Sequence, residues 1–555
     1  MRRRPVLSVL GLLLRPNSSH SFATSSSGTS WTSNNSYLDR LQTHEGNDDS
    51  PSTLVQPSRN PEQILSSIDD SILRSGLLLD RSEILRRIDE KHAKDAVACS
   101  SLPAEVDPST PNDIEYEWIH VQREGKQHPI AIRTIGSTPL LDGASIQRIR
   151  SAAERQWSDP NSGIKSRFTY QRRGNYEAHL DDLAKKDSAI EAIVDDLLRT
   201  KVYPLIRDAF GSSELVVDDL TSLRFRVYDS LIIRYNATEA NIGMDPDILV
   251  GAGQPLHRDL GLVSVNIMLN SEEEFASGGT AFENQFDQMG SQPLKPVGPG
   301  HALSHLSSER HAGSSTTEGV RDILVMFITA TNIDLSVQSP VAPRLERCAR
   351  LKAKARGESQ AFENSADAAL CRTVYQRLAV DAYPGDGEAW HYLGMALRDY
   401  YSEKGLEDEQ LSLDCLLHAT TLTPCDGRLH NNLGLSFGSL YMEPGFQTFF
   451  DQAHNCYKKS TLLHRAAQLA GCDIGQELDA AILNYGLFIA NLDRFTEAAD
   501  ILASATSIND FWRMKDCASH ALTDSEAAHL QIIQDADGLR KFCKAKSAED
   551  SGKGT

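Results

Sequence analysis

The sequence predicts an α+β region followed by an all-α region, and two observations carry that prediction. Between residues 118 and 329, short runs rich in β-branched residues and bounded by Gly, Pro or charged turns alternate with amphipathic helical patterns. From residue 371 onward, helical patterns dominate and a Leu-Gly pair recurs. The chain has 555 residues, enough for two or three domains. We therefore expect a mainly antiparallel core flanked by helices, followed by a helical repeat domain.

Composition limits the classes of function. The chain carries 56 Lys and Arg against 76 Asp and Glu, a formal net charge of −20, and this disfavours nucleic-acid binding, which depends on neutralising phosphates. The nine cysteines form no C-x-x-C pair, so we expect neither a disulfide framework nor a zinc knuckle. No run of 18 apolar residues occurs, so we expect no transmembrane segment. No oligomeric state is predicted.

Residues 1–38 are typical of an organellar targeting segment. They hold four arginines and many serines, and no acidic residue precedes Asp39. We interpret this segment as mitochondrial. A plastid address is an alternative, and so is a secretory signal, because residues 6–14 form a short, mostly apolar run behind a basic start.

Residues 39–110 are predicted to contain a disordered linker and two amphipathic helices. The linker is rich in Ser, Asn, Thr and Pro and has little apolar surface to bury. Asn60, Pro61 and Gln63 form a helix-start pattern, with an N-cap, a proline at the first helical position and a capping-box partner. Apolar residues then recur at helical spacing, and we expect both helices to serve as packing elements: Ile64, Ile68, Ile72, Ile84, Leu85 and Ile88.

Residues 111–335 are predicted to form the α+β domain. The expected elements are, in order, strands at 118–121 and 130–132, helices at 146–157 and 190–198, and strands at 223–235, 262–270 and 320–329.

A candidate metal site lies before the strand at 262–270. His257 and Asp259 are two residues apart, so on an extended chain an imidazole and a carboxylate point the same way. A third ligand must come from His301, His305 or His311. Two histidines and one carboxylate on one face of a metal, with open positions, are typical of non-haem Fe(II) oxygenases.

Arg321 favours His311 among these candidates. It follows His311 by ten residues and shares strand parity with Ile323, Val325 and Phe327, so its guanidinium would enter an apolar interior. A buried guanidinium requires a carboxylate partner. A dicarboxylate co-substrate bound to the metal at one end and to Arg321 at the other would provide one, and 2-oxoglutarate has that chemistry.

The motifs resemble those of the 2-oxoglutarate and Fe(II)-dependent dioxygenases, in the prolyl 4-hydroxylase-like branch. The resemblance covers roughly residues 115–330. It rests on four pieces in order: His257-Arg258-Asp259, a glycine-containing turn at 275–282, His311-Ala312-Gly313, and Gly319-Val320-Arg321. It implies a double-stranded β-helix (jelly-roll), iron held by His257, Asp259 and His311, and 2-oxoglutarate bound by Arg321, Tyr235 and Thr317. His305 is the alternative third ligand, and His301 is expected to be a bystander.

The same resemblance implies a reaction. The enzyme would use Fe(II), 2-oxoglutarate and O₂, with ascorbate as a further cofactor, to hydroxylate an unactivated C–H bond, releasing succinate and CO₂. The expected substrate is a prolyl residue of a protein. Two alternatives stay open: a dioxygenase acting on a small molecule, and a scaffold whose barrel is catalytically silent.

The carboxyl half is similar to tetratricopeptide repeats. Residues 390–394 carry W-x-x-L-G, and the pairs Leu433-Gly434 and Tyr485-Gly486 repeat its end. We expect about three degenerate repeats that bind a protein or peptide substrate, with flanking helices near 365–382 and 520–545; a generic helical domain is the alternative. The predicted organisation is a targeting segment (1–38), linker and amphipathic helices (39–110), dioxygenase domain (111–335), linker helix (336–370), repeat-like domain (371–545) and disordered tail (546–555).

Overall fold

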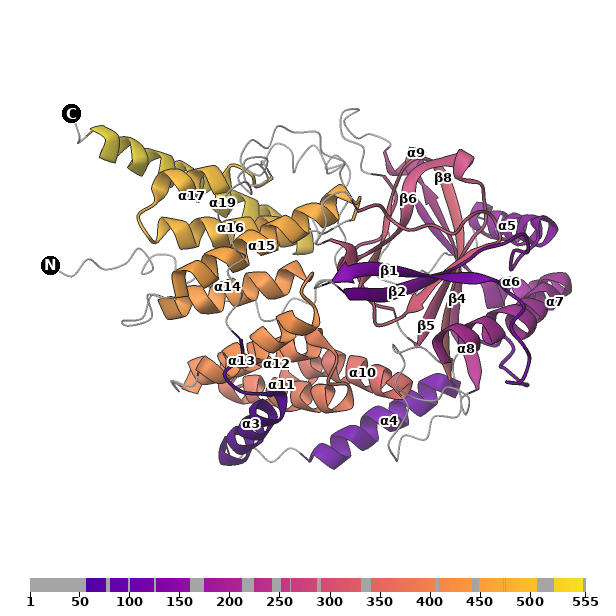
Figure 1. Cartoon of the computed structure of the whole chain (residues 1–555), viewed down its shortest axis with the longest axis horizontal. Helices are drawn as coiled ribbons and strands as arrows, with labels where there is room; N and C mark the ends of the chain where they lie inside the picture. The colour runs from indigo at the N-terminus through magenta and orange to yellow at the C-terminus, as the bar shows by residue number, and fades with distance from the viewer. Residues whose placement is uncertain are drawn as a thin grey trace.

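The computed structural model describes residues 56–75, 80–97, 100–123, 126–159, 174–211, 224–241, 251–259, 261–286, 291–330, 341–404, 409–441, 449–472, 474, 476–506 and 524–552. A strand-rich half and a helical half lie side by side (Figure 1). The targeting segment predicted at 1–38 lies outside these residues. Among the helices described, none combines the length and the hydropathy that a membrane span requires.

The strand-rich half is built on an eight-stranded sheet in the order β1-β2-β7-β5-β8-β4-β3, with β6 paired to β8 beside this path. Every pairing between the strands described is antiparallel. The predicted α+β class with an antiparallel core is therefore confirmed, whereas the jelly-roll stays a prediction. The strands are β1 (Tyr116–Arg123), β2 (Lys126–Thr134), β3 (Asn175–His179), β4 (Phe225–Asn236), β5 (Val263–Met268), β6 (Phe275–Phe282), β7 (Ala302–Leu306) and β8 (His311–Ala330).

Alternation along β4 and β8 separates two apolar faces, because successive side chains of a strand point to opposite sides. Ile232 and Leu324 join the main core with the helices, whereas Leu231, Ile323 and Val325 form a second cluster on the other face. The helices that contribute to the main core are α5 (Gly143–Ser158), α6 (Leu180–Lys186), α7 (Ser188–Asp196), the π-helix η1 (Leu197–Val202) and α8 (Tyr203–Gly211). The second face is left to form a cavity.

The helical half begins earlier than the sequence predicts. Cys348, Leu351 and Ala355 of α10 are buried in one core with α11, so the described helix within the stretch 336–370, which was predicted as a linker helix, belongs to this packed half. The disordered tail predicted at 546–555 is wrong through Gly552, because α19 continues to that residue. The helices are α10 (Val341–Ser359), α11 (Ser365–Ala382), α12 (Gly387–Lys404), α13 (Glu409–Leu422), α14 (Gly427–Tyr441), α15 (Phe450–Leu469), α16 (Glu477–Ala490), α17 (Phe495–Leu502) and α19 (Asp524–Gly552).

The two amino-terminal helices, α3 (Pro61–Ser75) and α4 (Arg81–Val97), also pack on the helical half. α3 begins as predicted: the amide of Gln63 donates to Asn60 Oδ1 at 2.9 Å, and the amide of Asn60 donates back to Gln63 Oε1 at 3.0 Å. The isoleucine stripes of α3 and α4 join the core of α10–α13. Arg347 of α10 forms a bidentate hydrogen bond with Asp89 of α4. Segments far apart in the sequence thus form one helical unit.

Candidate metal centre

Backbone pairing brings the predicted ligands together. The amide of His257 donates to the carbonyl of His311 at 2.8 Å, and the amide of His311 returns the bond at 2.9 Å. Asp259 follows on the same extended segment, where its amide donates to the carbonyl of Ser307 at 3.1 Å. As a result, one ligand atom from each of His257, Asp259 and His311 lies within 4.8 Å of the other two.

Main-chain carbonyls fix the orientation of both imidazoles. His257 Nδ1 lies 2.7 Å from the carbonyl oxygen of Pro255, and His311 Nδ1 lies 2.9 Å from that of Glu309. Because a carbonyl oxygen only accepts, each Nδ1 carries a proton, and each Nε2 is left to face the metal position. Those Nε2 atoms lie 3.3 Å (His257) and 3.4 Å (His311) from the carboxylate oxygens of Asp259. Two imidazole nitrogens and a carboxylate therefore face one point.

The protonation states of two of these groups already suit a metal. Burial raises the pKa of Asp259, but the neighbouring His311 and His257 outweigh it and hold this pKa well below the usual range. Burial lowers the pKa of His311 to about 3, so this imidazole is neutral near pH 7. Burial also opposes protonation of His257, yet Asp259 raises its pKa above the usual value. A divalent cation would displace the proton from Nε2 of His257, because a histidine must be neutral to bind a metal.

Ser264 holds the carboxylate of Asp259. Its Oγ donates to Asp259 Oδ2 at 2.5 Å and lies 3.2 Å from the hydroxyl of Ser307. Outer hydrogen bonds of this kind orient a ligand and leave the other carboxylate oxygen for the metal.

The structure leaves His305 and His301 outside the three-residue cluster. The ring of His305 is fully buried, 4.3 Å from the ring of His311 between centroids, and its Nδ1 lies 2.9 Å from the carbonyl oxygen of Leu306. His301 lies beside Thr134, 3.3 Å from its hydroxyl. Among the residues that the structure describes, only His257, Asp259 and His311 form a potential metal site.

A cavity of about 260 Å³ opens beside the triad. Its lining includes the three ligands, Tyr235 and Arg321, with an apolar wall formed by Leu231, Ile233, Ile323, Val325 and Phe327. The strand parity predicted for Arg321 is therefore confirmed, because Arg321, Ile323, Val325 and Phe327 all line this one cavity.

Arg321 is a buried cation that lacks a carboxylate partner among the described residues. Its side chain is 3% exposed, its Nε has no hydrogen-bond partner, and its Nη1 donates to the carbonyl of Gly279 at 3.4 Å. The guanidinium lies 5.2 Å from the ring centre of Tyr235, its cross-strand neighbour. Burial lowers the pKa of Arg321. A carboxylate ligand in the cavity would satisfy this group, so the residues present fit 2-oxoglutarate as well as iron.

Gly278 leaves room for Arg321. The segment predicted as a turn at 275–282 is instead strand β6, with a register shift between Ala276 and Ser277. The φ angle of Gly278 is +71°, and a Cβ atom there would come within 3.0 Å of Arg321 Cδ. The glycine therefore serves both the left-handed backbone and the arginine beside it.

Thr317 is not brought to the site. Its hydroxyl donates to Ser277 Oγ at 3.0 Å, and Thr317 is absent from the described residues that line the cavity. Sequence reasoning missed several polar lining residues. Asn266 gave a signal, since it is a polar residue inside an otherwise apolar strand; the others, which gave none, are Glu177, Tyr228, Gln254 and Thr280.

No protein-family model matches the sequence, and no curated protein matches it. Among solved structures, AviO1 from Streptomyces viridochromogenes Tue57 is similar over 38% of this chain and 93% of its own, with 18% identity and a TM-score of 0.24. An oxidoreductase of the 2OG-Fe(II) oxygenase family from Burkholderia pseudomallei is similar over 50% of this chain and 96% of its own, with 14% identity and a TM-score of 0.18. TM-scores this low establish no shared function between this chain and the two proteins.

Proposed function

We propose that the protein is an Fe(II)- and 2-oxoglutarate-dependent dioxygenase that hydroxylates an unactivated C–H bond. One observation carries this proposal: a two-histidine, one-carboxylate cluster and a buried arginine with no carboxylate partner among the described residues line the same cavity. When bound, iron and 2-oxoglutarate would supply the activation of O₂: one oxygen atom would convert 2-oxoglutarate to succinate and CO₂, and the other would enter the C–H bond of the substrate as a hydroxyl.

At the metal end, the chain supplies three preorganised ligands. His257 and His311 present Nε2 because carbonyls hold their Nδ1 protons, and Asp259 stays ionised. Three protein ligands on one face leave the remaining positions of a six-coordinate ion for the co-substrate and O₂.

At the other end, Arg321 would bind the distal carboxylate of 2-oxoglutarate. Its guanidinium is a planar donor with an unpartnered Nε, so it can bind a carboxylate without first breaking a salt bridge. Tyr235 packs against the guanidinium and contributes to its placement. Apolar side chains line part of the cavity, and a less polar lining strengthens electrostatic contacts at both ends.

Co-substrate turnover tests the proposal. The purified full-length protein with Fe(II) should convert 2-oxoglutarate to succinate, and a chelator should stop the reaction. His257→Ala and His311→Ala should abolish turnover, whereas His305→Ala, the matched buried histidine, should retain it. Succinate formation that survives loss of either ligand would contradict the assignment.

The finer proposal is that the substrate is a prolyl residue of a protein recruited by tetratricopeptide-like repeats, with ascorbate supporting turnover. Three glycines of the recurring motif support the repeats, because each lies where consecutive helices approach closely. Added Cβ atoms would meet Cys415 at 3.1 Å from Gly394, Tyr457 at 3.0 Å from Gly434, and Leu502 at 2.5 Å from Gly486. The helix pairs are α12–α13, α14–α15 and α16–α17.

Substrate and location have direct tests. Mass spectrometry of proteins captured by the full-length enzyme should find hydroxyproline that depends on His311; modification of a small metabolite alone would refute the protein substrate. Mitochondrial targeting by residues 1–38 belongs to the same proposal. A fluorescent protein fused behind these residues should reach mitochondria, and delivery to plastids or secretion would refute the assignment.

A further inference from the structure

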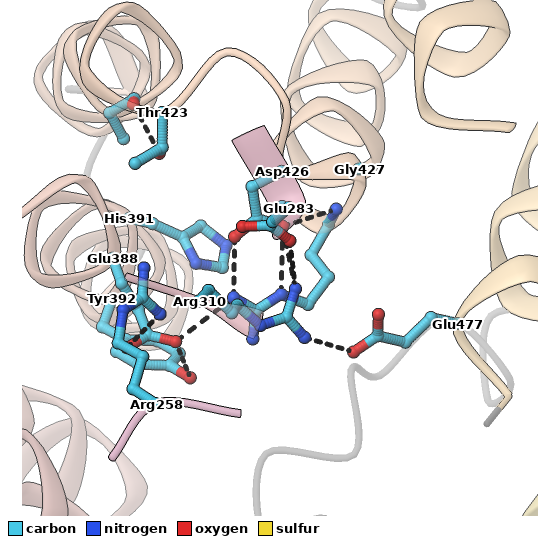
Figure 2. Close-up of polar contacts among 12 residues, drawn as sticks. Arg258, Glu283, Arg310, Glu388, His391, Tyr392, Thr423, Asp426, Gly427 and Glu477 are labelled. Atoms are coloured by element: carbon cyan, nitrogen blue, oxygen red, sulfur yellow. Dashed lines mark hydrogen bonds and ion pairs between the residues drawn. The ribbon is translucent and has the colours of Figure 1, made fainter. Parts of the chain in front are cut away.

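The two segments that carry the metal ligands also form the interface with the helical half. Arg258 lies between His257 and Asp259, and Arg310 directly precedes His311. Figure 2 shows Arg258 near Glu388, and Arg310 near Asp426 and Glu477 of the helical half and Glu283 of its own half. Ligand and interface residues thus alternate along the same short stretches of backbone.

Arg258 links the first segment to α12. Its Nη1 lies 3.2 Å from Glu388 Oε2, and its Nε donates to the carbonyl of Ser308 at 2.9 Å. Glu388 also meets Lys352 of α10 at 2.9 Å and Arg428 of α14 at 3.2 Å. A carboxylate shared by three helices and the ligand segment fixes that segment relative to the helical half.

Arg310 links the second segment to α14 and α16. It pairs with Glu283 of its own half, and it lies 3.3 Å from Glu477 and 3.8 Å from Asp426 of the helical half. The arginine is 8% exposed and Asp426 is 1% exposed, so these charges are shielded from water and act strongly on one another.

Uncharged contacts continue along β8 beyond His311. Ala312 is fully buried in a core shared with the helical half. Ser314 Oγ donates to the carbonyl of Ala470 at 2.7 Å, and the amide of Ser315 donates to the carbonyl of Gly471 at 3.0 Å. Gly471 has a φ of +75°, and a Cβ atom there would come within 2.6 Å of Ser314 Oγ, so this approach requires glycine. The residues on both sides of His311 are therefore held by the helical half.

We propose that the helical half completes the metal centre: through Glu388, Glu477 and Asp426 it holds Arg258 and Arg310 as positioning residues that keep His257, Asp259 and His311 convergent. The inference rests on the proposed metal site but concerns affinity for the ion, not the reaction. Side chains two apart on an extended segment share a face, so a segment fixed through Arg258 presents both of its ligands together. Loss of an anchor lets the two ligand segments move apart.

Anaerobic metal titration of the full-length protein tests this inference, with Co(II) as the probe because its visible spectrum reports ligand geometry. Glu388→Gln and Glu477→Gln each remove one anchoring charge without changing side-chain size. We expect each to raise the Co(II) dissociation constant about tenfold, the scale seen when groups that orient metal ligands are lost, and to alter the Co(II) spectrum.

The matched control is Asp399→Asn. Asp399 lies on α12 like Glu388 and pairs with Arg372 at 3.0 Å, but this pair lies within the helical half. Asp399→Asn should leave Co(II) affinity and spectrum unchanged. If Glu388→Gln and Glu477→Gln behave like this control, the proposal is overturned. Should Glu388→Gln not fold, Glu477→Gln decides the question from a different helix.

Failure of this inference differs from failure of the proposed function. A wild-type protein that binds Co(II) but never turns over 2-oxoglutarate loses the dioxygenase role, while weakened binding in Glu388→Gln still supports positioning. Normal turnover with unchanged metal affinity in both variants removes the positioning role alone. A wild-type protein that binds no divalent metal refutes both.

Discussion

Two buried arginines, Arg310 just before β8 and Arg321 in the middle of that strand, have opposite surroundings. Arg310, at the interface with the helical half, lies among Glu283, Asp426 and Glu477. Arg321, inside the cavity, has no carboxylate partner among the described residues, and its Nε is unpaired. Burial opposes the charge of both; the carboxylates nevertheless raise the pKa of Arg310, whereas the pKa of Arg321 is lowered.

This difference distinguishes an arginine that maintains the fold from one that can bind a ligand. When a buried charge has partners within the chain, removing one member destabilises the fold, because the other charge is left buried and uncompensated. A buried charge that has no partner within the chain carries an uncompensated desolvation cost. A bound anion would offset this cost, so such a charge marks a ligand site. Burial alone would have placed the two arginines in the same class.

The largest expected effect concerns stability. Arg310→Met should lower the free energy of unfolding by about 3–5 kcal/mol, because it leaves the buried carboxylate of Glu283 without its cation. Arg321→Met removes a cation that lacks a partner, so it should leave this free energy unchanged or raise it. Denaturant titration of both variants without metal or co-substrate measures the contrast; equal losses would show that the two arginines do not differ.

The next effect concerns co-substrate affinity. Arg321→Met should raise the dissociation constant for 2-oxoglutarate about 10- to 100-fold, because a hydrogen bond to a charged group contributes about 1.5–3 kcal/mol. Calorimetry on the Co(II)-loaded protein measures it. Co(II) affinity itself should stay as in the wild type, since Arg321 is not a ligand. An unchanged 2-oxoglutarate affinity would show that Arg321 does not bind the co-substrate.

A smaller effect is expected on the affinity of the site for Co(II). Ser264→Ala removes the hydroxyl that holds Asp259, so Co(II) affinity should fall about tenfold. Stability should change little beyond the loss of one hydrogen bond, about 1 kcal/mol. If Ser264→Ala binds Co(II) like the wild type, the carboxylate is positioned by its other contacts.

A further effect is expected in how the free energy of unfolding depends on pH, because of a buried histidine at the interface. Burial lowers the pKa of His391, beside Asp426 and Arg428, to about 4. Between pH 6.5 and 4 the unfolded chain binds this proton and the folded chain does not, so unfolding becomes easier as pH falls. His391→Gln should reduce the slope of unfolding free energy by up to about 1.4 kcal/mol per pH unit.

Other interface groups provide the background for that measurement. Burial raises the pKa of Glu283 to about 7, and this acts in the opposite direction between pH 4.5 and 7. The comparison of wild type with His391→Gln cancels the contribution of Glu283. An identical pH slope in the two proteins would contradict the assignment of a neutral, buried His391.

Much of the candidate site could be predicted from local sequence patterns. The spacing of His257 and Asp259 and the parity of Arg321 depend only on strand geometry, and the structure keeps both. The capping pattern at Asn60 likewise placed the start of α3. These features could be predicted because each is determined by residues close together in the sequence.

The interface could not be predicted in this way. An isoleucine stripe such as Ile64 and Ile68 shows that a helix has a buried face but does not name the surface that covers it. The partners of Arg258 and Arg310 come from helices far along the chain, so no spacing rule connects them. α10 did carry apolar spacing at Cys348, Leu351 and Ala355, and its interpretation as a linker overlooked that signal.

One cavity is proposed to hold ferrous iron and 2-oxoglutarate together, and a single spectroscopic measurement tests this. Anaerobic addition of Fe(II) and then 2-oxoglutarate should produce a visible charge-transfer absorption at one iron per chain, the signature of a chelated α-keto acid. The absorption should be lost in His257→Ala and His311→Ala and kept in His305→Ala. No absorption in the wild type, or an equal absorption in His257→Ala, would contradict the account.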